Sequence, residues 1–121
     1  MTGPLALAAL MALLQPQPAA ADFRPIDSRR VFVAEVADRT LIAAVLGLSV
    51  RMEASGRIRG TAQGREVVGR WTWEGGEFCR TLRWEGGNWP RNCQLVEIDG
   101  DKVRLTANGG DGSSVVFNLG D

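Results

Sequence analysis

The spacing of apolar residues changes once along the chain. Within residues 28–37, Phe32, Val33 and Val36 recur at near-helical intervals, and Ser28 is placed to cap the first turn. This pattern predicts one short amphipathic helix. Phe and Val have modest helix propensity, so packing against the rest of the protein must hold the helix.

After residue 40 apolar and polar residues alternate with a period of two, which is typical of half-buried strands. The alternation is plain over residues 46–52, and clusters of Gly, Asp and Asn separate the runs that follow. The predicted strands span residues 46–52, 57–62, 65–73, 77–84, 92–98, 102–107 and 114–119, with a further short strand at 40–43.

Nearly every connection between these strands has the length of a hairpin, which favours an antiparallel meander. A meander of about eight strands removes its exposed edges by closing into a barrel. We therefore expect an all-β domain with one short N-terminal helix, built as a calycin-like barrel. The strands are short for a membrane barrel, which also needs an apolar outer band. Arginines interrupt the alternate faces of the strands, so no membrane-spanning barrel is expected.

Residues 1–21 carry no charged side chain. The apolar run Leu5–Leu14 is too short to span a bilayer, and the small residues Ala19–Ala21 follow it. This arrangement predicts a signal peptide over 1–21 and a single barrel domain over 22–121. The protein is then expected to be periplasmic or secreted. A buried N-terminal helix is the alternative for the apolar run.

Cys79 and Cys93 are the two cysteines, and they lie in neighbouring predicted strands. In an exported protein such a pair is usually a disulfide. The alternative is a redox pair, which usually requires closer spacing and an activating environment.

A stretch from residue 69 to 94 contains all four tryptophans, and Trp-Glu-Gly-Gly occurs twice in it. Side chains alternate across a strand, so if Phe78 and Leu82 face inward, Arg80 and Trp84 do too. The same reasoning on the adjacent strands turns four further residues inward, namely Trp71, Trp73, Gln94 and Val96.

Two interpretations of this interior remain open. In the first, Trp71, Trp73, Arg80, Trp84 and Gln94 line a small ligand site, and Arg80 receives an anion. In the second, the tryptophans are core, and Arg80 lies at one mouth of the barrel. There it would stack on a tryptophan and pair with an acidic residue, Glu77 or Glu97.

Trp89 and Arg91 flank Pro90 in a predicted loop. An exposed tryptophan is a common contact residue at protein interfaces, so these two residues are candidates for an interaction site.

The amino-acid composition excludes several kinds of binding and catalytic site. Acidic and basic residues balance at 14 each, so nothing points to a nucleic-acid partner. The chain has no His and no Tyr, which removes the commonest general base and the His metal ligand. The glycines at 109–112 lack the following Lys of a phosphate loop, and the aspartates lack calcium-loop spacing. We expect no catalytic residues, no metal and no cofactor.

The segments Gly69–Trp73, Phe78–Arg80, Asn92–Gln94 and Asp99–Asp101 resemble those of a group of small secreted bacterial proteins without assigned activity. The resemblance runs from Ser28 to Leu119 and implies a secreted, disulfide-linked β-domain. Some members of this group are labelled dihydrodipicolinate reductase, but the chain lacks the glycine-rich dinucleotide fingerprint that such an enzyme needs.

The leading hypothesis is a non-enzymatic β-barrel that binds a small or anionic ligand. The rival hypothesis is an interaction or inhibitor module of the cell envelope, and a reductase comes last. The hypotheses differ over whether the barrel interior is open or filled.

Overall fold

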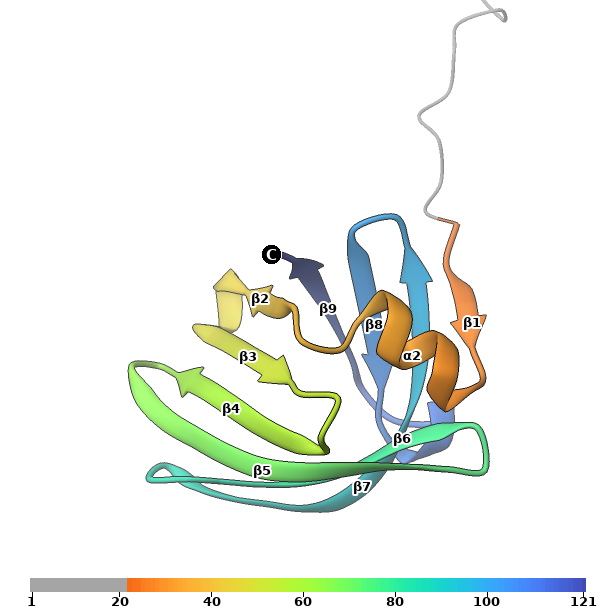
Figure 1. The fold of residues 1–121 in the computed structure, drawn as a ribbon. Coiled ribbons are helices and arrows are strands. Elements are labelled where there is room, and N and C mark those ends of the chain that lie inside the picture. Colours follow the sequence, from red (N-terminus) through yellow and green to blue (C-terminus); the bar gives the residue numbers. More distant parts are fainter. Residues whose placement is uncertain (1–21) are drawn as a thin grey trace, which may run out of the picture.

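A computed structural model describes residues 22–121 (Figure 1). The predicted signal peptide, residues 1–21, lies outside the described residues. The elements are β1 (Arg24–Ile26), α2 (Arg29–Glu35), β2 (Thr40–Ala43), the 3-10 turn η1 (Ala44–Leu46), β3 (Leu48–Met52), β4 (Arg57–Ala62), β5 (Arg65–Glu74), β6 (Glu77–Trp84), β7 (Gly87–Asp99), β8 (Lys102–Thr106), the 3-10 turn η2 (Asn108–Gly110) and β9 (Ser114–Leu119).

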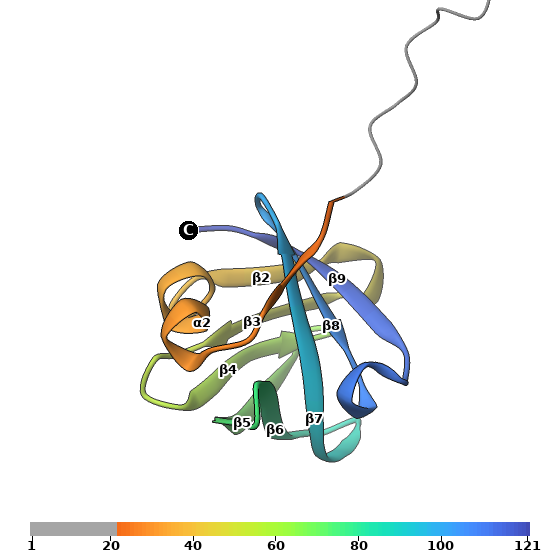
Figure 2. The ribbon, with the colours of Figure 1, turned by 90° about the vertical axis from the view of Figure 1, so that its right-hand side faces the viewer.

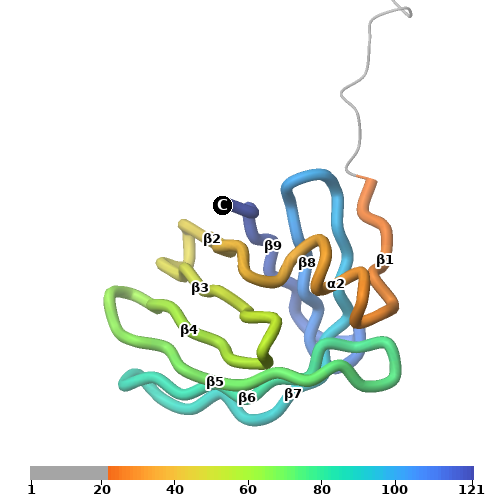
Figure 3. Tube along the Cα trace, in the orientation of Figure 1, coloured from red at the N-terminus to blue at the C-terminus, as the bar shows by residue number. Residues whose placement is uncertain are grey.

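Eight strands form a closed antiparallel barrel, as the hairpin-length connections predict. Strands β2 to β9 each pair with their sequence neighbours, and β9 returns to β2 (Figures 2 and 3). The closing seam between β2 and β9 is short, with Leu41 opposite Leu119 and Ile42 opposite Asn118.

The longest strand, β7, belongs to two parts of the barrel. Its first half pairs with β6, and its second half pairs with β8 on one side and β1 on the other. Pairing with β6 shifts register between Arg80, opposite Asn92, and Leu82, opposite Trp89. Because two residues of β7 then face Thr81, this irregularity is a β-bulge in β7.

The sequence pattern predicts two regions differently from the structure. β1 is not among the predicted strands. Only Ile26 of its three residues is buried, so the segment is too short to show the alternation of a strand. The segment with Trp89 and Arg91 was predicted as a loop, but it forms the first half of β7. Pro90 disfavours a strand in the sequence, yet a bulge is one of the places where a strand tolerates proline.

The helix fills one end of the barrel interior. Phe32 of α2 is 1% exposed, and its ring contacts Trp71, Trp73 and Phe78 at centroid distances of 5.0, 5.3 and 5.2 Å. Ser28 caps the helix by accepting a hydrogen bond from Val31 N. The helix contains only seven residues, so this aromatic packing, rather than its own hydrogen bonds, holds it.

Cys79 and Cys93 form a disulfide, as predicted. The two residues lie directly opposite each other on β6 and β7, with Cα atoms 3.9 Å apart. Cys79 is buried but lies on the opposite face of β6 from Phe78, and it does not belong to the hydrophobic core cluster.

Removing this disulfide is expected to lower the free energy of unfolding by roughly 2–5 kcal/mol, because the loop between the cysteines gains freedom in the unfolded chain. Urea unfolding of the wild type with and without dithiothreitol, and of the Cys79→Ser/Cys93→Ser variant, measures this. The double variant should not respond to the reductant. Two free thiols titrated in the native protein would contradict the pairing.

Gly60 lies where β3 and β4 approach closely. A Cβ atom there would lie 2.1 Å from the carbonyl oxygen of Ser49. Gly60→Ala is therefore expected to destabilise the fold by about 1–3 kcal/mol in urea unfolding, because backbone must move. Thr61→Ala, at the exposed neighbouring position, is the control and should change stability little. Equal stability of Gly60→Ala and wild type would show that the strands can separate without cost.

Candidate functional site

The barrel interior is not filled at the end away from α2. A cavity of about 300 Å³ lies there, and twelve of its fifteen lining residues are apolar. Phe78, Met52 and Ile58 contribute to its lining, and Phe78 also contacts Phe32 of the helix. The aromatic cluster under α2 thus lies directly beside the cavity. The size is at the lower end for small-ligand pockets.

Arg80 is the charged residue of this lining. The parity prediction is confirmed, since Arg80 lines the same space as Phe78 and Leu82. Its Nη1 donates a hydrogen bond of 2.7 Å to the carbonyl oxygen of Pro90, at the bulge. Partial burial removes water from the guanidinium and lowers the pKa of Arg80 from its usual value.

Arg80 has neither of the partners that the structural interpretation required. The ion pairs recorded within residues 22–121 are Arg59–Glu53, Arg91–Glu74 and Arg104–Glu97. In that part of the chain, the cations over aromatic rings are Arg29 and Arg104. Arg80 therefore presents a partly desolvated charge, held by a carbonyl, to an apolar cavity.

Two further polar side chains line the cavity, Gln94 and Ser113. Gln94 lies opposite Phe78 on β7, as predicted, and is half-buried. No side-chain hydrogen bond of Gln94 is recorded within residues 22–121, so its amide can serve a ligand as donor and acceptor.

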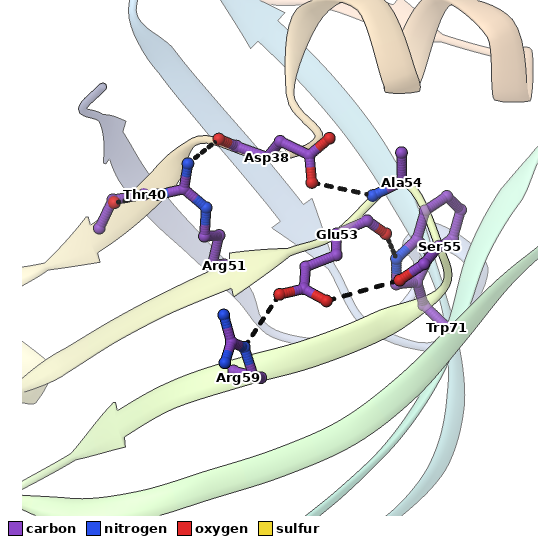
Figure 4. Close-up of polar contacts among 8 residues, drawn as sticks. All are labelled: Asp38, Thr40, Arg51, Glu53, Ala54, Ser55, Arg59 and Trp71. Atoms are coloured by element: carbon purple, nitrogen blue, oxygen red, sulfur yellow. Dashed lines mark hydrogen bonds and ion pairs between the residues drawn. The ribbon is translucent and has the colours of Figure 1, made fainter.

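Trp71 and Trp73 do not line the cavity, although their inward direction is as predicted. Both pack on Phe32 in the aromatic cluster. The indole Nε1 of Trp71 donates to the carbonyl oxygen of Glu53 at 2.8 Å, beside the ion pair of Glu53 with Arg59 (Figure 4). These contacts support a structural role for Trp71. Trp73 Nε1 is buried without a partner in the described part of the chain.

The same figure shows how the turn after β3 is held. Asp38 accepts a hydrogen bond from Ala54 N at 3.1 Å, and its carbonyl oxygen accepts from Arg51 (Figure 4). These contacts connect the residues after α2 to the end of β3 and the β3–β4 turn. The same segment contains Glu53, whose carbonyl oxygen accepts the hydrogen bond from Trp71.

Trp89 lines the cavity, which the sequence did not indicate. Uninterrupted alternation from Gln94 and Asn92 would place Pro90 inside and Trp89 outside. The bulge inserts one residue and reverses the alternation, so Trp89 faces Leu82 across the strands. Trp84 packs on Trp89 at 5.3 Å and is not part of the lining.

Arg91 lies on the outer surface. It forms an ion pair with Glu74. The pKa of Glu74 is lowered first by the hydrogen bond from the Thr72 hydroxyl and then by the hydrogen bond and the charge of Arg91. The predicted interaction pair Trp89 and Arg91 is therefore divided between the interior and the surface.

Residues 22–121 contain no group of three or more Cys, Asp or Glu side chains arranged to hold a metal ion. Over the same range, no helix is long and apolar enough to cross a membrane.

Comparisons with protein-family models, with curated proteins and with solved structures find no match for this chain. The resemblance to the group of secreted bacterial proteins thus stays a prediction.

Arg80→Met is expected to change the free energy of unfolding by less than about 1 kcal/mol, because an apolar side chain of similar length replaces a partly desolvated charge without an acidic partner. Urea unfolding checks this, with Arg83→Met on the same strand as the exposed control. A loss of several kcal/mol for Arg80→Met alone would show that the guanidinium–carbonyl contact is needed for folding.

Proposed function

We propose that this protein is a periplasmic or secreted binding protein that holds a small amphiphilic anion in its barrel. The apolar part of the ligand would occupy the cavity, and its carboxylate or other anionic group would meet Arg80. The observation that carries the proposal is the half-buried guanidinium of Arg80, which faces an apolar cavity without a carboxylate partner in the described chain.

Energetics favour an anion over a neutral ligand at this position. A cation in partly apolar surroundings interacts strongly with an opposite charge, because little water screens the pair. A guanidinium can also donate two parallel hydrogen bonds to a carboxylate. The unpaired Gln94 amide adds a donor and an acceptor that would orient the same head group.

The cellular location rests on two features. Residues 1–21 have the pattern of a signal peptide, and the Cys79–Cys93 disulfide suits an oxidising compartment. Both features support export of the protein.

Binding can be tested by tryptophan fluorescence, because Trp89 lines the cavity. Hexanoate, octanoate and decanoate are titrated against the wild type, with octanol as the uncharged probe. The carboxylates should change the emission at saturable concentrations. Arg80→Met should weaken carboxylate binding by roughly tenfold or more and leave octanol binding unchanged.

Two matched variants complete the experiment. Val115→Phe should reduce binding of every probe, because it fills the cavity, whereas Arg30→Met on the exposed side of α2 should change none. Equal carboxylate affinities of Arg80→Met and wild type, or no saturable response to any probe, would contradict the proposal.

A second candidate function is an interaction module of the cell envelope. An apolar surface patch on β2, η1 and β9 supports it, in which Ile42, Val45, Leu46 and Val116 are 39%, 99%, 49% and 45% exposed. Such a contiguous patch is typical of a contact surface. If this candidate is correct, the wild type binds none of the carboxylate or octanol probes. It associates with an envelope partner instead, and Val45→Asp abolishes that association.

A further inference from the structure

Three arginines gather on the outer face of the sheet, across the same strands from the cavity. Arg57 of β4 lies directly opposite Arg70 of β5, and Arg83 of β6 lies opposite Val68, diagonal to Arg70. All three are exposed, and none takes part in an ion pair recorded within residues 22–121. In Figure 1 their strands form the lower side of the barrel.

These arginines surround a groove of about 380 Å³. Its lining also includes Val68 and Thr81, and Thr81 lies opposite Arg70 on the neighbouring strand. No hydrogen bond of the Thr81 hydroxyl is recorded in the described chain, which leaves it available as a donor. Three guanidinium groups and a hydroxyl around one hollow are the donor set that recognises phosphate.

The arrangement carries a cost when the groove is empty. Like charges directly opposite each other on adjacent strands destabilise a sheet, and Arg57 and Arg70 stand in this relation. Arg59, the other arginine on this face of β4, is neutralised by Glu53 at 2.9 Å, whereas these three are not. A bound anion would offset this repulsion, because it attracts both guanidinium groups.

We propose that this groove binds a phosphate group, such as the phosphomonoester or diphosphate end of a small molecule or of a lipid. A long polyanion fits less well, since the same face of β5 carries Glu66 and Glu74 on either side of the arginines. The positive region is therefore short, and it suits one compact, highly charged group.

Titration with pyrophosphate, followed by calorimetry and by the thermal unfolding midpoint, tests the site. The wild type should bind and be stabilised as the concentration rises. Arg70→Gln and Arg83→Gln should each weaken binding roughly tenfold or more, and Thr81→Val should weaken it less. Arg30→Gln, an exposed arginine on α2, is the control and should bind like the wild type.

A measurement without ligand separates binding from folding. Because Arg70→Gln relieves the repulsion with Arg57, its midpoint in the absence of pyrophosphate should equal or exceed that of the wild type. A lower midpoint, equal weakening by Arg30→Gln, or no binding to either phosphate source described below would overturn the proposal.

The two sources of the phosphate group are distinguished by vesicles. Co-sedimentation with phosphatidic acid vesicles, compared with phosphatidylcholine vesicles, reports a lipid head group, and pyrophosphate titration reports a soluble ligand. Arg70→Gln must abolish whichever binding is seen. Arg80→Met should retain it, so that failure of this proposal and failure of cavity binding can be told apart.

Discussion

The packing of Phe32 against Trp71, Trp73 and Phe78 is the contact on which the rest of this structure depends. An eight-stranded barrel has an interior just wide enough for side chains or one small ligand. Here a single helical residue brings large rings together at one end. At the other end the helix contributes no lining residue, and a cavity remains among strand and turn residues such as Leu48, Ala107 and Val115. One end therefore supplies stability and the other supplies space.

Arg80 lies where these two regions meet. Its partner is a carbonyl oxygen that the bulge at Pro90 turns toward it, rather than a carboxylate. A carbonyl orients the guanidinium without neutralising it, so the charge is positioned but still available. An acidic partner would have stabilised the arginine and removed most of its attraction for an anion.

Much of this architecture could be predicted from the sequence, because strand alternation and hairpin spacing are local signals. The alternation of Phe78, Arg80 and Leu82 placed Arg80 in the interior correctly. The same rule failed at Trp89, since one inserted residue reverses the parity of everything before it. Parity also tells which side chains point inward but not at which depth. Trp71 and Trp73 were therefore expected in the site, although α2 covers them, and only the tertiary position of Phe32 reveals this.

The short strand β1 holds residues 24–26 against β7 at the edge of the sheet. The backbone N–H of Asp22 donates a hydrogen bond of 3.0 Å to the carboxylate of Asp99, beside the pairing of Arg24 with Ile98. If a signal peptidase cuts after Ala21, this nitrogen becomes a free α-amino group. Such a group titrates near pH 7.7–8.0, so below that range an ammonium would face the same carboxylate. Proteolytic maturation would then replace a hydrogen bond from an uncharged N–H with an ion pair. The new N-terminus would be held against the barrel by a charge that the cleavage itself produces.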